Sequence, residues 1–165
     1  MGRPWILDYD SANCAIGATV GIIGERSTFL VLREAFNGVR RFDDMRRRTG
    51  MPRQVLSDRL ARLVREELLR KVPYQDSGQR SRWEYRLTSK GLDLYPVLVA
   101  LLEWGNQHAV SRAGPQVELR HRDCGEPVHL QLACEAGHVL ADAREVTRCP
   151  APAPARSPDG AGQIA

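Results

Sequence analysis

The stretch FDDMRRRTGMPRQVLSDRLARLVREE, residues 42–67, decides the fold. Asp43 and Asp44 open its first half and three arginines close it, which is the charge order that a helix dipole favours. A tight connection follows, and Pro52 then stands where the first turn of a helix tolerates proline. Beyond it, apolar side chains recur at helical spacing: Val55, Leu56, Leu60, Leu63 and Val64. Two helices joined by a short turn, the second polar and basic on its free face, predict a helix-turn-helix.

Two strand-like runs follow the second helix. Residues 69–74 and 82–87 alternate in polarity and are rich in aromatic or branched side chains, which is typical of strands. Residues 75–81 between them are polar and basic at one end. The pattern predicts a β-hairpin with an exposed tip, and a helix-turn-helix followed by such a hairpin is a winged helix.

Two further helices are expected before this motif. The small apolar residues 14–24 predict a short buried helix. Ser27 is a favourable N-cap for a second helix, over residues 28–36, that stops at Asn37-Gly38. The fold class is therefore mainly α with a small β-hairpin wing (α+β).

A last helix is expected after the wing. Thr88 caps it, it runs from Ser89 to about residue 110, and Pro96 interrupts it. Its apolar positions are too many for a helix lying alone on a small domain: Leu94, Val97, Leu98, Leu101, Leu102 and Trp104. These side chains either close the core or pair with a second subunit.

The charge of the 165-residue chain is uneven. Its net charge is +4, but residues 40–90 contain 15 basic and 7 acidic residues, a local net charge of +8. Arginine, which supplies most of it, matches phosphate oxygens and guanine edges. The segment therefore predicts a polyanionic partner, although a solvated basic face would give the same count.

The sequence also excludes some classes of protein. No run approaches the roughly 18 apolar residues that a membrane-spanning helix needs, and residues 1–14 lack the pattern of a secretory signal. We expect a cytoplasmic protein with no membrane partner.

Four segments are predicted along the chain. Residues 1–13 form an N-terminal arm, and residues 14–112 form the winged helix-turn-helix for DNA binding and dimerisation. Residues 113–149 form a small β-rich appendage. The Pro/Ala/Gly-rich residues 150–165 are expected to be a disordered tail.

Several further motifs stand in order between Cys14 and His108. They are IGER (23–26), LVLRE (30–34), GVRRFDD (38–44), LSDRL (56–60), EYRLTSKG (84–91) and Trp104-Gly105. With them the chain resembles the HxlR-type family of bacterial winged-helix transcription regulators, distant relatives of the MarR type. The chain departs from that family at Ser27, where the family usually has tryptophan, and at Ala15, where proline often follows the cysteine.

The resemblance implies a homodimer, and we expect a sequence-specific transcription regulator, a repressor, that dimerises through its terminal helices. Such a homodimer binds a palindromic double-stranded DNA operator, with its recognition helices in successive major grooves and its wings on the flanking minor grooves. We also expect this regulator to respond to an effector, either a small molecule or thiol stress.

The recognition helix and its surroundings supply the candidate DNA contacts. Arg53 and Gln54 are expected to read bases, and Arg59 to contact a phosphate or a base, while Asp58 orients a neighbouring arginine. The full set of candidates is Arg40, Arg41, Arg53, Gln54, Ser57, Arg59, Arg62, Arg80 and Arg82. Within it, Arg40 and Arg41 are backbone clamps, and the two wing arginines contact phosphate or the minor groove. Arg46, Arg47 and Arg48 fit this role or that of surface charge equally well.

Cys14 permits two interpretations. Small cysteines are often buried core residues. The resemblance offers the second, since several relatives sense oxidants, quinones or aldehydes through a cysteine at this position, so Cys14 is a redox-sensing candidate.

The C-terminal segment contains a candidate metal site. His121, Cys124, Cys134 and His138 offer imidazole and thiolate groups, which suit tetrahedral zinc, and the segment resembles a degenerate zinc ribbon. The alternative is a metal-free hairpin with residues 117–119 and 130–132 as strands. No other cofactor is indicated, and four cysteines in a cytosolic chain do not argue for structural disulfides.

Two other functions are less well supported by the sequence. A winged helix can serve as a protein-interaction or architectural module, but the arginines of the recognition helix favour DNA. An enzyme is not expected, because the chain shows no P-loop, GxGxxG or Ser-His-Asp element and its histidines fall only at His108 and beyond.

Overall fold

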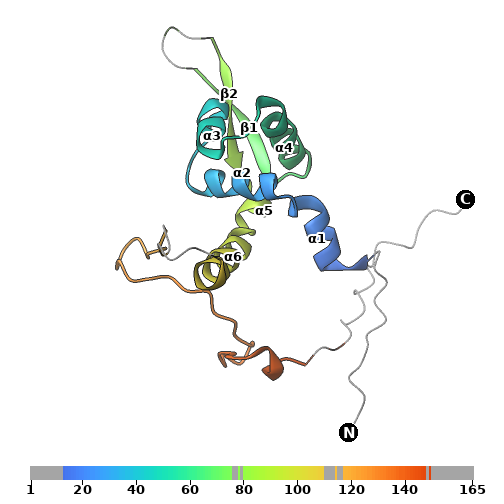
Figure 1. The fold of residues 1–165 in the computed structure, drawn as a ribbon, viewed down its shortest axis with the longest axis vertical. Helices are drawn as coiled ribbons and strands as arrows, with labels where there is room; N and C mark the ends of the chain where they lie inside the picture. Colours follow the sequence, from blue (N-terminus) through green and yellow to red (C-terminus); the bar gives the residue numbers. More distant parts are fainter. Residues whose placement is uncertain are drawn as a thin grey trace, which may run out of the picture. The chain divides into compact units, whose positions relative to one another are not determined.

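The structure contains a helix-turn-helix that is followed by a two-stranded hairpin (Figure 1). The computed structural model describes residues 13–75, 78, 80–109, 114, 117–147 and 149. Its elements are α1 (Ala15–Ile23), α2 (Arg26–Phe36), α3 (Phe42–Thr49), α4 (Arg53–Arg65), β1 (Leu69–Tyr74), β2 (Arg82–Leu87), α5 (Ser89–Leu92), α6 (Tyr95–His108) and the 3-10 helix η2 (Ala143–Glu145). The chain divides into two units, with one boundary between Leu130 and Gln131. Every element except η2 lies in the unit that ends at Leu130. The predicted fold class, mainly helical with a hairpin wing, is confirmed.

The turn between α3 and α4 forms as the sequence predicts. Gly50 caps α3 in the left-handed conformation, at a φ of 68°, and its N–H donates to the carbonyl of Arg46 at 2.9 Å. The helix α4 ends at Arg65, because Glu67 adopts a φ of 58°. The N–H of Leu68 then donates to the carbonyl of Leu63 and leads the chain into β1.

One hydrophobic core holds these helices together. It is made of fully buried side chains from α2, α3 and α4: Val31, Leu32, Met45, Leu56, Leu60 and Leu63. The α4 residues among them are spaced at three and four positions, so one face of α4 is buried and the opposite face is free.

The wing is the antiparallel pair β1 and β2, with the predicted bounds. Its register runs from Leu69 opposite Leu87 to Tyr74 opposite Arg82. Gly91 of α5 packs at the base of the hairpin, where a Cβ atom would lie 2.1 Å from the carbonyl oxygen of Leu68. Of the predicted tip, residues 76, 77 and 79 lie outside the described residues.

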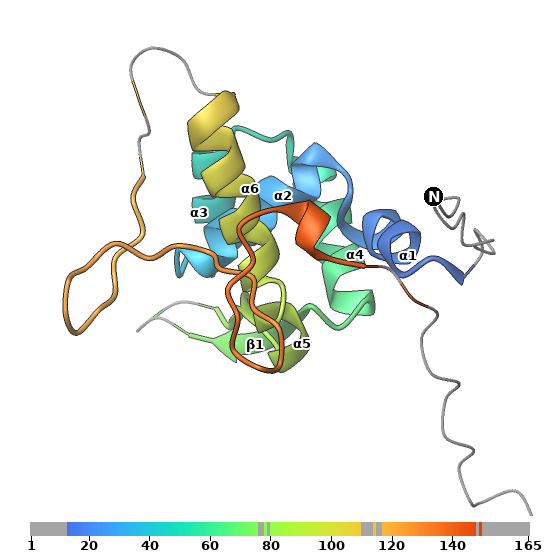
Figure 2. The same cartoon turned by 90° about the horizontal axis from the view of Figure 1, so that it is seen from below.

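The N-terminal helices differ from the prediction in two ways. The helix α1 is not buried, since Ile16 is 76% exposed, Val20 is 58% exposed, and only Ile23 is buried. It projects from the side of the helical core (Figures 1 and 2). Glu25, not Ser27, is the N-cap of α2, and its side chain makes no capping bond because its carboxylate binds two arginines of α4.

The last predicted helix is split into α5 and α6. Thr88 caps α5 as predicted, and its Oγ1 accepts a hydrogen bond from the N–H of Gly91 at 3.0 Å. The break falls at Asp93-Leu94, and Pro96 stands in the first turn of α6, where proline is tolerated. No single helix among the described residues is long and apolar enough to cross a membrane, and α1 with α2 passes that test only as a pair bent by 80°.

The predicted pairing of residues 117–119 with 130–132 is wrong. The described residues from 117 to 147 contain no strand, only the isolated bridges Arg120–Pro127 and Ala133–Val139. Each candidate strand folds back on a closer segment, since the N–H of Val128 donates to the carbonyl of Leu119 at 2.8 Å and that of Leu140 to Leu132 at 2.9 Å. Nearly all of the predicted arm and the whole predicted tail lie outside the described residues, and the four segment boundaries stay predictions.

Candidate nucleic-acid interface

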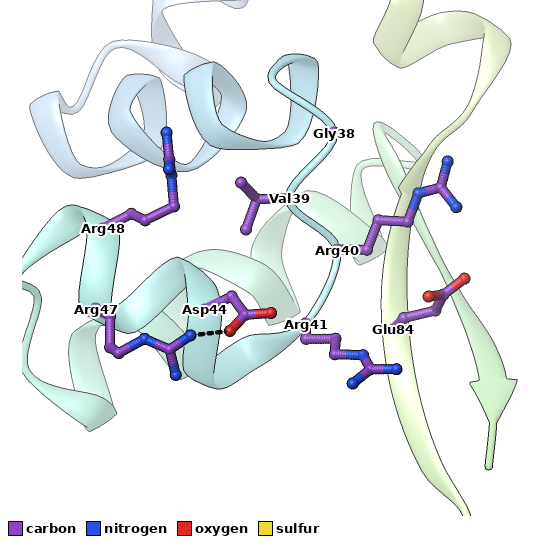
Figure 3. Close-up of a pocket in the computed structure, with 8 residues that line it drawn as sticks. All are labelled: Gly38, Val39, Arg40, Arg41, Asp44, Arg47, Arg48 and Glu84. Atoms are coloured by element: carbon purple, nitrogen blue, oxygen red, sulfur yellow. Dashed lines mark hydrogen bonds and ion pairs between the residues drawn. The ribbon is translucent and has the colours of Figure 1, made fainter. Parts of the chain in front are cut away.

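A basic groove lies between the α2–α3 turn, α3 and β2 (Figure 3). Its volume is about 650 Å³, and four of its eight lining residues are arginines. They are Arg40, Arg41, Arg47 and Arg48, and Asp44 and Glu84 are the acidic residues of the lining. Figure 3 shows Arg47 and Arg48 on α3 and Arg40 and Arg41 on the turn that leads into it, which concentrates positive charge beside the wing.

Backbone hydrogen bonds fix the turn that holds Arg40 and Arg41. The N–H of Val39 donates to the carbonyl of Glu34 at 3.0 Å, and the N–H of Tyr85 donates to the carbonyl of Arg40 at 2.8 Å. The turn is thereby attached to α2 on one side and to β2 on the other. The guanidinium of Arg41 lies 4.4 Å from the centre of the Tyr74 ring, a cation–π distance. These contacts place both arginines where the helices meet the wing.

The free face of α4 presents the predicted reading residues. Arg53, Gln54 and Ser57 are exposed, and the guanidinium of Arg53 lies 5.1 Å from the Phe42 ring centre. The amide of Gln54 donates to Asp58 Oδ1 at 2.9 Å. Asp58 therefore orients this glutamine, where the sequence suggested a neighbouring arginine.

Arg59 and Arg62 face away from that surface. Both guanidinium groups donate to Glu25 Oε1, and the bond from Arg62 Nη1 is 3.1 Å long. Arg62 also donates to the carbonyl of Gly21. Helical periodicity could have predicted this orientation, because a turn of 100° per residue puts positions 59 and 62 on a different side of α4 from positions 53 and 57. Periodicity does not identify their partner, because Glu25 lies 34 residues before Arg59 in the sequence.

The wing carries exposed arginines and one residue that the sequence reading missed. Arg80 and Arg82 are exposed, and neither is in an ion pair with another described residue. Trp83 is 56% exposed and lies opposite Pro73 in the hairpin. An aromatic side chain next to Arg82 in a strand was the available signal. Figure 1 shows the hairpin extending past α3 and α4, away from α6.

Comparison with known families decides the class of protein. The model of the HxlR-like helix-turn-helix matches residues 22–113. The chain belongs to this family. It is 44% identical over 138 residues to the uncharacterized HTH-type transcriptional regulator Rv3095 of Mycobacterium tuberculosis, covering 84% of this chain and 86% of the relative. The family and these relatives are transcription regulators, so the expectation that the chain is not an enzyme agrees with the comparisons.

Two solved structures share the fold of this HxlR-family chain. PA1607, described as a candidate transcription factor, is 34% identical with a TM-score of 0.74, over 84% of this chain and 95% of that one. PA1374 of Pseudomonas aeruginosa, with the same kind of description, is 32% identical with a TM-score of 0.60, over 87% and 96%.

Two arginines at the end of α3 are engaged within the HxlR-family chain. Arg47 forms an ion pair with Asp44, and Arg48 Nε donates to Glu34 Oε2 at 2.5 Å. Glu34 is only 2% exposed, and Arg33 Nη2 donates to its Oε1 at 2.6 Å. Burial alone would raise the pKa of Glu34, but the hydrogen bonds and charges of Arg48 and Arg33 outweigh it and lower the pKa below its ordinary value. Arg48 thus joins α3 to α2.

Cys14 is the N-cap of α1. It is partly exposed, and its Sγ accepts a hydrogen bond from the N–H of Gly17 at 3.4 Å. It is therefore not a fully buried core cysteine, and its sensing role stays a prediction.

The candidate metal ligands occur as two separate pairs. His121 Nδ1 lies 3.2 Å from Cys124 Sγ, and Cys134 Sγ lies 3.5 Å from His138 Nδ1. No group of three or more metal-ligating side chains occurs among the residues that the structure describes. The four-ligand zinc site stays a prediction.

Proposed function

We propose that this protein is a homodimeric repressor that binds a palindromic DNA operator in the cytoplasm and releases it in response to a small molecule or a thiol modification. The observation that carries the proposal is the free, polar face at the start of α4, flanked by the exposed arginines of the wing. A face of this kind fits the major groove, while the wing reaches the flanking backbone.

The contacts divide by position. Arg53, Gln54 and Ser57 read base edges, because they are exposed on the first turns of α4. Arg40, Arg41, Arg80 and Arg82 contact phosphates or the minor groove. Arg59 and Arg62 position α4 through Glu25, and any phosphate that they meet competes with that carboxylate.

Two apolar surfaces support the homodimer. Val97, Leu101 and Trp104 form one stripe on α6 and are 39%, 49% and 62% exposed. Ile16 and Val20 form a second stripe on α1. Contiguous exposed apolar surface of this kind marks an interaction site, and a second copy of the chain covers it in the proposal.

The dimer gives a first prediction. Trp104→Arg will place a charge in the α6 stripe, and the molar mass measured by sedimentation equilibrium will fall from that of two chains toward that of one. Asp93→Arg, an exposed position between α5 and α6, is the matched control and will keep the mass of the parent. An unchanged mass in the Trp104 variant would contradict the proposed interface.

The repressor is tested with the intergenic DNA upstream of its own gene. Fluorescence anisotropy over a series of salt concentrations will show tighter binding to this DNA than to a scrambled duplex of the same length, because specific complexes exceed non-specific ones by about 10³-fold or more. Equal affinity for both duplexes at every salt concentration would refute a sequence-specific regulator.

The wing gives a second prediction. Replacing Arg80 and Arg82 together by alanine will weaken binding to the operator and to scrambled DNA by a similar factor. It will also reduce the slope of log K against log salt by about 2, because each lost phosphate contact removes about one unit. Arg122→Ala, an exposed arginine outside the wing, is the control. A selective loss of operator binding would show instead that the wing reads bases.

A further inference from the structure

An apolar cavity of about 320 Å³ lies between α2 and α6 and is outside the proposed DNA surface. Residues Val117 and Leu119 of the following segment complete its wall. Most of its lining is aromatic or aliphatic, including Phe29, Phe36, Tyr95, Leu98 and Leu102. A concave site of mainly apolar lining with a few polar groups is what small-molecule sites share.

The lining limits the chemistry of the occupant. The rings of Phe36 and Tyr95 lie 5.1 Å apart between centres and are inclined by 41°, so a flat ring can pack against them. Arg33 and Asn37 supply the polar groups of the lining. The bonds from Arg33 to Glu34 use Nε and Nη2, which leaves Nη1 as a donor for an acidic or carbonyl oxygen.

The volume limits the size. A cavity of about 150 Å³ holds benzene, so 320 Å³ suits a molecule of one or two rings. A helix from a second copy, about 10 Å across, is too wide for such a space.

The position of the cavity connects the two surfaces that the regulator needs. On one side, Val31 and Leu32 of α2 share a core with Leu56 and Leu60 of α4. On the other side, α6 carries the apolar stripe assigned to the second copy, and Leu101 of that stripe also lines the cavity. A molecule between α2 and α6 therefore changes how the recognition helices sit relative to each other in the dimer.

The geometry points to this cavity as the effector site, for a flat molecule of one or two rings with a carboxylate at the Arg33 end. The assignment rests on the proposed function for its regulatory consequence. The binding step itself needs no DNA, so the two are measured separately.

Binding is tested by titration calorimetry of 2-naphthoate into the full-length protein. We expect one molecule per chain and at least a tenfold loss of affinity in Leu119→Trp, whose indole fills the cavity. Leu132→Trp adds the same indole at an exposed position outside the lining and will bind like the parent. Absence of binding at millimolar 2-naphthoate, or equal affinity in the Leu119 variant, would overturn the site.

The role of Arg33 is tested with a neutral analogue. Naphthalene-2-methanol will bind about 5- to 10-fold more weakly than 2-naphthoate, and Arg33→Met will remove that difference while Arg48 still pairs with Glu34. Circular dichroism melting verifies that this variant is folded. A folded variant that keeps its preference for the carboxylate would overturn the assigned orientation.

The regulatory step is tested last, on the upstream DNA. Saturating 2-naphthoate will lower operator affinity at least fivefold in the parent and will have no effect on the Leu119 variant. If 2-naphthoate binds but the affinity for the operator does not change, the effector role is refuted. If 2-naphthoate binds and no specific DNA complex forms at all, the proposed function fails while the ligand site stands. One further outcome would overturn the site: the parent does not bind 2-naphthoate and Leu119→Trp loses the dimer. That result would mean that a side chain of the second copy fills the cavity.

Discussion

Replacing Arg53 by alanine will lower the affinity for the operator by about 5- to 150-fold, which corresponds to about 1–3 kcal/mol for one lost base contact. The guanidinium is exposed on the first turn of α4 and stacks on Phe42 without an ion pair to another described residue. It is therefore free to form the bidentate contact that arginine makes with guanine. Specificity will relax at one base pair of each half-site.

The measurement is a competition assay in which every single-base variant of the operator half-site displaces a labelled duplex. Arg65→Ala, exposed at the far end of the same helix, serves as the matched control and will change affinity much less. Arg53→Lys separates charge from geometry, because lysine keeps the charge and loses the planar fork. An alanine variant that weakens all duplexes equally would reassign Arg53 to the DNA backbone.

The helix-turn-helix and the wing could be predicted from the sequence because their signals are local. Leu56, Leu60 and Leu63 repeat at helical spacing, and the helix they define buries them all. The strand bounds 69–74 and 82–87 also agree with the structure. In each case the residues that specify the helix or strand lie close together in the sequence.

The features that the sequence could not give depend on partners far along the chain. Glu25 was not expected to cap α2, and its carboxylate binds Arg59 and Arg62 of α4. The same pairing withdraws both arginines from the exposed face that the charge count assigned to DNA. The exposed position of α1 is a second example, since its apolar composition predicts burial but this chain supplies little to pack against Ile16 and Val20.

Glu25 also belongs to a set of contacts between α4 and the two N-terminal helices. Arg62 donates both to Glu25 and to the carbonyl of Gly21, so α4 is joined to the end of α1 and to the start of α2. If the proposed dimer or a modification of Cys14 displaces α1, these bonds carry the displacement to α4.

The ion pairs of Glu34 give the second large effect, which is on stability. Replacing Arg33 and Arg48 together by methionine will leave the Glu34 carboxylate, 2% exposed, without a cation. Breaking a buried pair in this way costs about 3 kcal/mol of unfolding free energy, the lower end of the usual range because both arginines are about half exposed. Urea denaturation at pH 7 measures it. Arg47→Met, which breaks the exposed pair with Asp44, will cost less than about 1 kcal/mol.

The dependence on pH distinguishes this electrostatic account from a loss of packing. In the parent the pKa of Glu34 is lowered from 4.5, so its contribution to stability is complete above pH 4.5 and is lost as the pH falls through the lower folded pKa. Without the arginines, burial alone remains and raises the pKa, so Glu34 destabilises the double variant as the pH rises above 4.5. The deficit of about 3 kcal/mol will therefore shrink on acidification, and adding Glu34→Gln to the double variant will recover most of it at pH 7. A deficit that stays constant from pH 7 to pH 4 would mean that the methionines disturb packing and that the charge of Glu34 does not contribute.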